Sequence, residues 1–222
     1  MTQQEVLIPK MKRIDKKQNR IKLPFFSVLI VLCALLLIIA STFVGFELKH
    51  YIVPAGFWSG KVLSQEDYIV SFYVIPQIPV LMFICSALEK KMAVFSVVLY
   101  LILGIFFAPL FALGGGFSYI SEYSFGYLLA YFPAALIATS FLCRRRSFIN
   151  MFLAALCGVL IIHVLGFLYM LLIVLFKHDG GSFISGWITY QSGMKILYDF
   201  VLSFVLILIG KYVNYAVKFI SD

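Results

Sequence analysis

A few polar residues that could hold a small solute stand inside otherwise apolar stretches of this chain. Asp199 is the only carboxylate inside a long apolar run, and Gln77 lies between two prolines in another. A third run ends in three consecutive glycines, Gly114, Gly115 and Gly116. A primary amide both donates and accepts hydrogen bonds, and glycine backbone approaches a ligand without side-chain hindrance. This set suits the binding of a urea, an amide or a heterocycle.

Each of these residues also has a structural interpretation. Asp199 could form an interfacial i,i+4 pair with Lys195, although an ionisable group at membrane depth favours a site. Gln77 serves equally well as an interhelical hydrogen bond, and the glycines could form a slack loop. His163 has no second histidine at metal-binding spacing, so a satisfied buried histidine is the better interpretation.

Aromatic and small residues flank these positions. Tyr100 precedes the glycine turn and Tyr127 follows it, and each could stack on a ligand or bond across helices. Small residues recur every four positions in the same region: Gly126, Ala130, Ala134 and Ala138. Such a ridge lets another helix approach closely, and we expect it to serve packing within a bundle more than contact with a partner subunit.

Composition indicates that these residues sit in an integral membrane protein. The chain has 222 residues, of which 63% are hydrophobic and 13% charged. Uncharged windows of roughly 17–25 residues mark membrane helices. We therefore predict an all-α polytopic protein with six transmembrane helices, at 24–46, 69–88, 92–113, 125–142, 150–176 and 193–216. We divide the chain into a basic extension (1–23), a membrane domain (24–216) and a short tail (217–222).

Charge predicts the orientation of the bundle. The chain has 18 basic residues, and most fall in the N-terminal extension, in the short loops around Lys90 and Arg145, and at the C-terminal end. The positive-inside rule then places both termini in the cytoplasm and the glycine turn outside. We expect the basic extension to contact the inner leaflet rather than nucleic acid.

The motifs of several enzyme and cofactor classes are missing from the sequence. There is no GxxxxGK[ST] loop for ATP, and no HExxH or GxSxG motif. The four cysteines have no metal or redox spacing. We expect neither an enzyme nor a cofactor, and uptake against a gradient would need energy from another subunit.

These motifs in combination resemble the BioY family, the biotin-binding S components of energy-coupling-factor (ECF) transporters. The resemblance rests on Gln77, Tyr100-Leu-Ile-Leu-Gly104, Pro109-Leu-Phe111-Ala112, Gly114 to Gly116 and Gly126-Tyr127-Leu128. Gly166 matches a glycine of the fifth helix, and Asp199 matches an acid at the start of the sixth. The similarity covers about residues 69–215.

The resemblance implies a six-helix S component of a bacterial plasma membrane. Such a subunit would bind biotin in an outward cup and associate with a transmembrane coupling protein and ABC-type ATPases. Gln77, Asp199 and the glycine backbone would hold the ureido head, with Tyr100 and Tyr127 along the walls. The family usually has a Lys where this chain has Leu202, and Lys195 would replace it.

Two alternatives stay open. The first keeps the fold and changes the ligand to another small vitamin-like ring compound, because Leu202 leaves the ligand's other end without its expected partner. The second is a membrane-embedded enzyme using Asp199 and His163, which we consider unlikely because no spacing pairs these residues.

Overall fold

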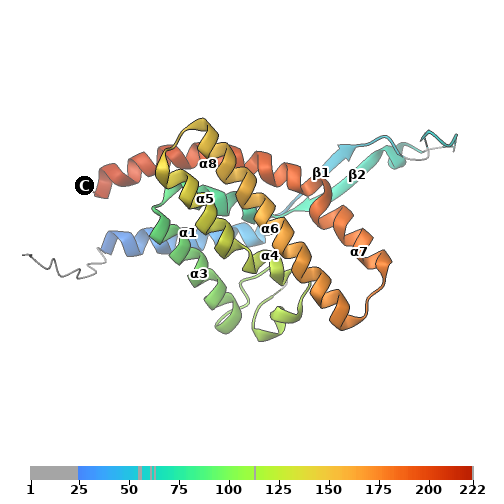
Figure 1. Cartoon of the computed structure of the whole chain (residues 1–222), viewed down its shortest axis with the longest axis horizontal. Coiled ribbons are helices and arrows are strands. Elements are labelled where there is room, and N and C mark those ends of the chain that lie inside the picture. Colours follow the sequence, from blue (N-terminus) through green and yellow to red (C-terminus); the bar gives the residue numbers. More distant parts are fainter. Residues whose placement is uncertain (1–24, 55–56, 61, 63, 113, 222) are drawn as a thin grey trace, which may run out of the picture.

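A computed structural model describes residues 25–221 apart from 55–56, 61, 63 and 113. The membrane-domain helices are α1 (Phe25–Phe43), α2 (Gln77–Ala87), α3 (Lys90–Phe106), α4 (Phe125–Leu129), α5 (Tyr131–Arg144), α6 (Phe148–Lys177), α7 (Gly181–Trp187) and α8 (Met194–Ser221). The shorter turns are η2 (Gln65–Tyr68), η3 (Phe117–Ser121) and η4 (Ile188–Gly193), and the strands are β1 (Phe46–Tyr51) and β2 (Ile69–Val74). Figure 1 shows a bundle of crossing helices from which the two strands project. The predicted basic extension, 1–23, lies outside the described residues.

Four helical segments of the described chain are long and apolar enough to cross a membrane: Phe25–Phe43, Phe125–Arg144, Phe148–Lys177 and Gln191–Phe219. They agree with the first, fourth, fifth and sixth predicted spans. The other two predicted spans contain α2, with 11 residues, and α3, with 17. At 1.5 Å per residue, an 11-residue helix covers only about half of a bilayer core. The mostly helical membrane fold is therefore confirmed, whereas the count of six spans remains a prediction.

The start of the second predicted span is wrong, because residues 69–74 form a strand. β1 and β2 pair antiparallel, with Phe46 opposite Val74 and Tyr51 opposite Ile69. The expectation of a purely helical chain overlooked this hairpin. β-Branched and aromatic residues make up most of β2 and favour extended backbone, and the following Pro76 disfavours a helix just before it.

The fourth predicted span is interrupted between α4 and α5. Pro133 has no N–H to bond the carbonyl of Leu129, and its ring would clash with that carbonyl in a continuous helix. α4 accordingly ends at Leu129 and α5 begins two residues later. The small-residue ridge packs inside the bundle on both sides of the break: Gly126 of α4 lies against the Cβ of Tyr169, and Ala134 and Ala138 of α5 are fully buried. Packing within the bundle is thus the role of this ridge.

The short helix α2 is the centre of the core. It packs against α1, α5 and α8, and Leu81 and Met82 are fully buried. Side chains also bond across this contact, since Ser86 donates to the carbonyl of Ile207 at 2.8 Å. The first turn of α1 and the C-terminal end of α8 lie at the same end of the bundle (Figure 1). The first turn of α2 points toward the other end.

Candidate ligand-binding site

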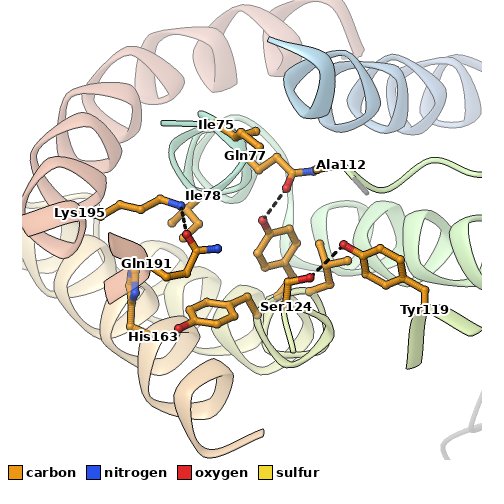
Figure 2. Close-up of a pocket in the computed structure, with 12 residues that line it drawn as sticks. Ile75, Gln77, Ile78, Ala112, Tyr119, Ser124, His163, Gln191 and Lys195 are labelled. Carbon is orange, nitrogen blue, oxygen red and sulfur yellow. Dashed lines mark hydrogen bonds between the residues drawn. The ribbon is translucent and has the colours of Figure 1, made fainter. Parts of the chain in front are cut away.

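A cavity of about 180 Å³ opens beside the first turn of α2. Six segments from distant parts of the chain contribute to its lining: Ile75, Gln77, Ile78, Ala112, Tyr119, Ser124, Tyr127, Leu128, Tyr131, His163, Gln191 and Lys195. Figure 2 shows Gln77 and Ala112 on one side, with Lys195 and Gln191 on the other. Three of the predicted site residues, Gln77, Tyr127 and Lys195, therefore face one cavity.

Gln77 is held by side chains from three helices. Its Nε2 donates to Thr42 Oγ1 of α1 at 2.5 Å and to Tyr100 OH of α3 at 2.9 Å. Tyr131 OH of α5 donates to its Oε1 at 3.2 Å (Figure 2). Both interpretations of Gln77 therefore apply, because it forms interhelical hydrogen bonds and also lines the cavity. Tyr100 is fully buried behind it and positions its amide.

A second hydrogen-bonded chain runs from the cavity wall into α8. Trp187 Nε1 donates to Tyr127 OH at 3.2 Å, and Tyr127 OH lies 2.8 Å from Ser192 Oγ. Ser192 Oγ is 3.4 Å from His163 Nδ1, and His163 Nε2 is 3.1 Å from Asp199 Oδ2. His163 is therefore a satisfied buried histidine, as expected, and its partner is the carboxylate of the last helix.

Asp199 is fully buried and does not line the cavity. Its ion-pair partner among the described residues is His163 rather than Lys195, so the exposed i,i+4 pair with Lys195 does not form. Lys195 Nζ instead lies 3.4 Å from Gln191 Oε1 on the cavity side. Asp199 Oδ1 and Ser203 Oγ, one turn apart, are buried without a hydrogen-bond partner in the described chain. The structure places Asp199 behind the site, where it fixes the His163 ring.

The glycine turn shapes the cavity from behind. Gly114 and Gly116 have φ of 119° and 85°, which side chains avoid. Gly114 N–H donates to the carbonyl of Phe111 at 3.0 Å, and Gly116 N–H donates to that of Gly104 at 2.9 Å. A Cβ on Gly115 would lie 2.7 Å from the Gly104 carbonyl oxygen. These backbone bonds close the turn against α3, and its neighbour Ala112, rather than a glycine, lines the cavity.

A cluster of aromatic rings lies next to this site. Tyr123 OH donates to the Asp179 carboxylate, and Lys177 Nζ lies 4.3 Å from the centroid of the Tyr123 ring. Phe183 and Trp187 of α7 pack on the same ring at 4.7 and 5.8 Å between centroids. The hydrogen bond to Asp179 is the main cause, and burial the second, of a pKa of Tyr123 that is raised to about 12. The cluster ties α7 to the loop before α4, and it continues through Trp187 into the chain that ends at Asp199.

Several lining residues were not predicted from the sequence. Tyr131, Ser124, Tyr119 and Gln191 occupy regions whose hydropathy or loop character shows no sign of a site. Ser124 and Tyr119 are bonded to each other at 3.1 Å (Figure 2). Gln191 lies in η4, a π-helical segment, and such segments occur often at functional sites. A local departure from α-helical geometry is therefore the signal that marks it, but it is visible only in the structure.

The lining of the cavity suits the binding of a small ligand. One wall offers an amide oxygen and hydroxyl groups, the opposite wall offers a lysine ammonium, and apolar side chains such as Ile78 and Leu128 lie between them. Such a site suits a small ligand with a neutral polar head and an anionic end. Within the described residues no group of three or more His, Cys, Asp and Glu side chains could hold a metal ion.

Comparisons with known proteins agree with this architecture. A solved structure with the same fold is described as "Crystal structure at 2.1 A of the S-component for biotin from an ECF-type ABC transporter". Its TM-score is 0.58 and its sequence identity 15%, and the match covers 86% of this chain and 90% of that one. A search of curated proteins found no match. A family model described as BioY family matches residues 17–219, and over that length the match shows that this chain belongs to the BioY family.

Proposed function

We propose that this chain is the substrate-binding S component of an ECF-type transporter and that it captures biotin in the cavity beside α2. The observation that carries the proposal is the separation of an amide wall at Gln77 from an ammonium wall at Lys195. Biotin has a neutral ureido ring at one end and a carboxylate at the other. The solved structure with the same fold is described as an S-component for biotin from an ECF-type ABC transporter.

The ureido ring would bind at the wall formed by Gln77, Tyr131 and Tyr127. The amide oxygen of Gln77 and the tyrosine hydroxyls provide the acceptors and donors that a cyclic urea requires. Lys195 would hold the carboxylate, taking the place of the basic residue that the family has at the position of Leu202. Asp199 would act through His163 and Ser192 by orienting Tyr127. The glycine turn would keep Ala112 and the cavity wall in place.

Family membership and the distribution of charge support the following transport cycle. The cavity end of the bundle would face outward, and the basic loops at Lys90 and Arg145 would face the cytoplasm of a bacterium. A transmembrane coupling protein and ABC-type ATPases would supply the energy for release on the inner side.

Equilibrium binding to the full-length protein in nanodiscs tests this function. We expect labelled biotin to bind, and Asp199→Ala to weaken binding at least tenfold, which corresponds to about 1.4 kcal/mol. We also expect Lys195→Met to remove the preference for biotin over its neutral primary amide. Lys211→Met is the matched control, because Lys211 is another partly buried lysine of α8. Equal selectivity in the two lysine variants would exclude Lys195 from carboxylate binding.

Leu202 supports a second candidate, a related ring compound without a biotin-type tail. A competition panel separates the two ligands: if biotin fails to compete at micromolar concentration while another vitamin-like compound does, the biotin assignment is refuted.

The contact between His163 and Asp199 meets the geometric requirement of the enzyme alternative, which the sequence did not predict. Family membership speaks against that alternative. Recovery of chemically unchanged biotin after binding would exclude it, whereas a time-dependent product would support it.

A further inference from the structure

The opposite end of the bundle contains a second cavity, of about 340 Å³, whose lining is strongly basic. It lies where α2 meets α3, between the end of α5 and the last turns of α8. Among the described residues, Lys90, Lys91, Arg146 and Lys218 are its basic lining residues, and Glu89 is its one carboxylate. Such a concave surface attracts an anion.

Among these basic residues, Arg146 gives the strongest indication of a bound anion. Its guanidinium is partly buried, and Nη1 has no hydrogen-bond partner among the described residues. This burial lowers the pKa of Arg146 below its ordinary value. A desolvated cation without a counter-ion is costly, and a phosphate group would satisfy both its charge and its hydrogen bonds.

An apolar groove of about 310 Å³ adjoins the basic cavity. α1 and α8 form its walls and α2 its floor, with lining residues that include Phe26, Leu29, Phe83, Ala87, Val213 and Val217. Leu88 lines both the groove and the basic cavity. On α8, Val213 and Val217 line the groove, and the residues that follow each of them, Asn214 and Lys218, line the basic cavity. The groove is thus continuous with a cationic pocket at its end.

We propose that this composite surface binds one anionic phospholipid, with its phosphate in the basic cavity and an acyl chain in the groove. A soluble phosphate would use only the cavity and leave the groove empty. A zwitterionic lipid has no net charge and would leave the net positive charge of the cavity lining unneutralised. The adjacency of a cationic pocket and an apolar groove favours an anionic diacyl lipid from the leaflet on the side of the basic loops. The site is independent of the ligand cavity, which lies at the other end of the helices.

Native mass spectrometry of the delipidated full-length protein measures this binding. Dioleoyl-phosphatidylglycerol is compared with dioleoyl-phosphatidylcholine, which has the same acyl chains. We expect the anionic lipid to bind at least tenfold more tightly. Arg146→Gln should reduce that affinity about fivefold, the effect of one basic side chain near an anionic lipid.

Arg145→Gln is the matched control, because Arg145 is an exposed neighbour that does not line the cavity. The Arg145 variant should bind phosphatidylglycerol like the native protein. Both variants retain the basic N-terminal extension, so any lipid binding by that extension is equal in the two. Lys91→Gln provides a second test if Arg146→Gln fails to fold, since Lys91 is exposed at the rim.

Three results with the lipids and the arginine variants would overturn the proposal, and a groove-filling variant provides a fourth test. The first is equal affinity for the two lipids, and the second is an equal loss in the Arg145 and Arg146 variants. The third is displacement of the lipid by glycerol 3-phosphate at similar concentration, which would reveal a site for free phosphate. Cys33→Trp fills the groove from α1 and should weaken phosphatidylglycerol binding; unchanged binding in this variant would refute the role of the groove.

Discussion

Adding one methyl group at Gly166 should disturb the ligand site without changing any polar residue. A Cβ at this position of α6 would lie 2.5 Å from both Cγ and Cδ1 of Tyr127. Van der Waals contact requires about 3.5–4.0 Å, so the ring must move by about 1 Å. These atoms are near the stem of the side chain, whose tip is fixed by Ser192 and Trp187. The ring therefore cannot move without lengthening its hydrogen bonds.

The cost of this change can be estimated from two terms. Overpacking a close-packed interior costs about 1–3 kcal/mol. A shift of about 1 Å also breaks the 2.8 Å contact between Tyr127 and Ser192, which adds about 1 kcal/mol. Gly166→Ala should then be about 2–4 kcal/mol less stable than a variant without the clash. At about 2–4 °C per kcal/mol for a chain of this size, the thermal midpoint should fall by about 5–15 °C.

Gly158→Ala is the matched control because it places the same methyl group on the same helix. Its Cβ would meet the Sδ of Met82 at 2.7 Å, and this flexible thioether end can move aside. The gain in helix propensity is common to both variants and cancels in the comparison. Thermal unfolding in detergent and biotin binding are measured for both. Equal midpoints together with equal affinities would refute the idea that Gly166 positions Tyr127.

Three further changes test the hydrogen-bonded parts of the site. Gln77→Met keeps the side-chain volume but removes the amide, so biotin affinity should fall more than tenfold by equilibrium binding; an affinity within a factor of two would exclude Gln77 from the site. Ser192→Ala should weaken binding about fivefold, the effect of a lost hydrogen bond of about 1 kcal/mol, whereas the exposed Ser185→Ala should not; equal effects would remove Ser192 from the chain. The raised pKa of Tyr123 means that its bond to Asp179 contributes stability below about pH 10 and loses it as pH rises through about 12. The thermal midpoint should accordingly fall more over this interval in the native protein than in Tyr123→Phe, and parallel curves would contradict the assignment.

Hydropathy predicted the long helices well because a bilayer requires a continuous apolar run. The fifth predicted span, 150–176, became α6 at Phe148–Lys177. It is extended at its start by a cap in which the Ser147 side chain accepts from Asn150 N–H at 3.3 Å. The same method failed at residues 69–88, because an average over a window does not distinguish an apolar strand from an apolar helix. The break before Pro133 was also overlooked, although the missing N–H is visible in the sequence.

The site was only partly predictable from the sequence. Gln77 and Tyr127 stood out as polar or aromatic residues beside prolines and glycines, and both line the cavity. The contact between His163 and Asp199 joins residues 36 positions apart, and no local pattern encodes it. Gln191 and Ser192 belong to a π-helical segment whose geometry depends on packing. Tertiary contacts, which a single sequence does not reveal, bring these residues together.

The bonding of Gln77 has a consequence for selectivity. Both hydrogens of its amide are already used by Thr42 and Tyr100, so the group can offer a ligand only the remaining lone pair of its oxygen. An acceptor fixed in this way binds ligands that donate an N–H more tightly than isosteres in which that N–H is replaced by an oxygen or an N-methyl group. Loss of a required donor leaves a buried acceptor unpaired, and discrimination of this kind is far stronger than discrimination by apolar size. Analogues altered at one ring atom should therefore be excluded more sharply than analogues with a longer or shorter tail.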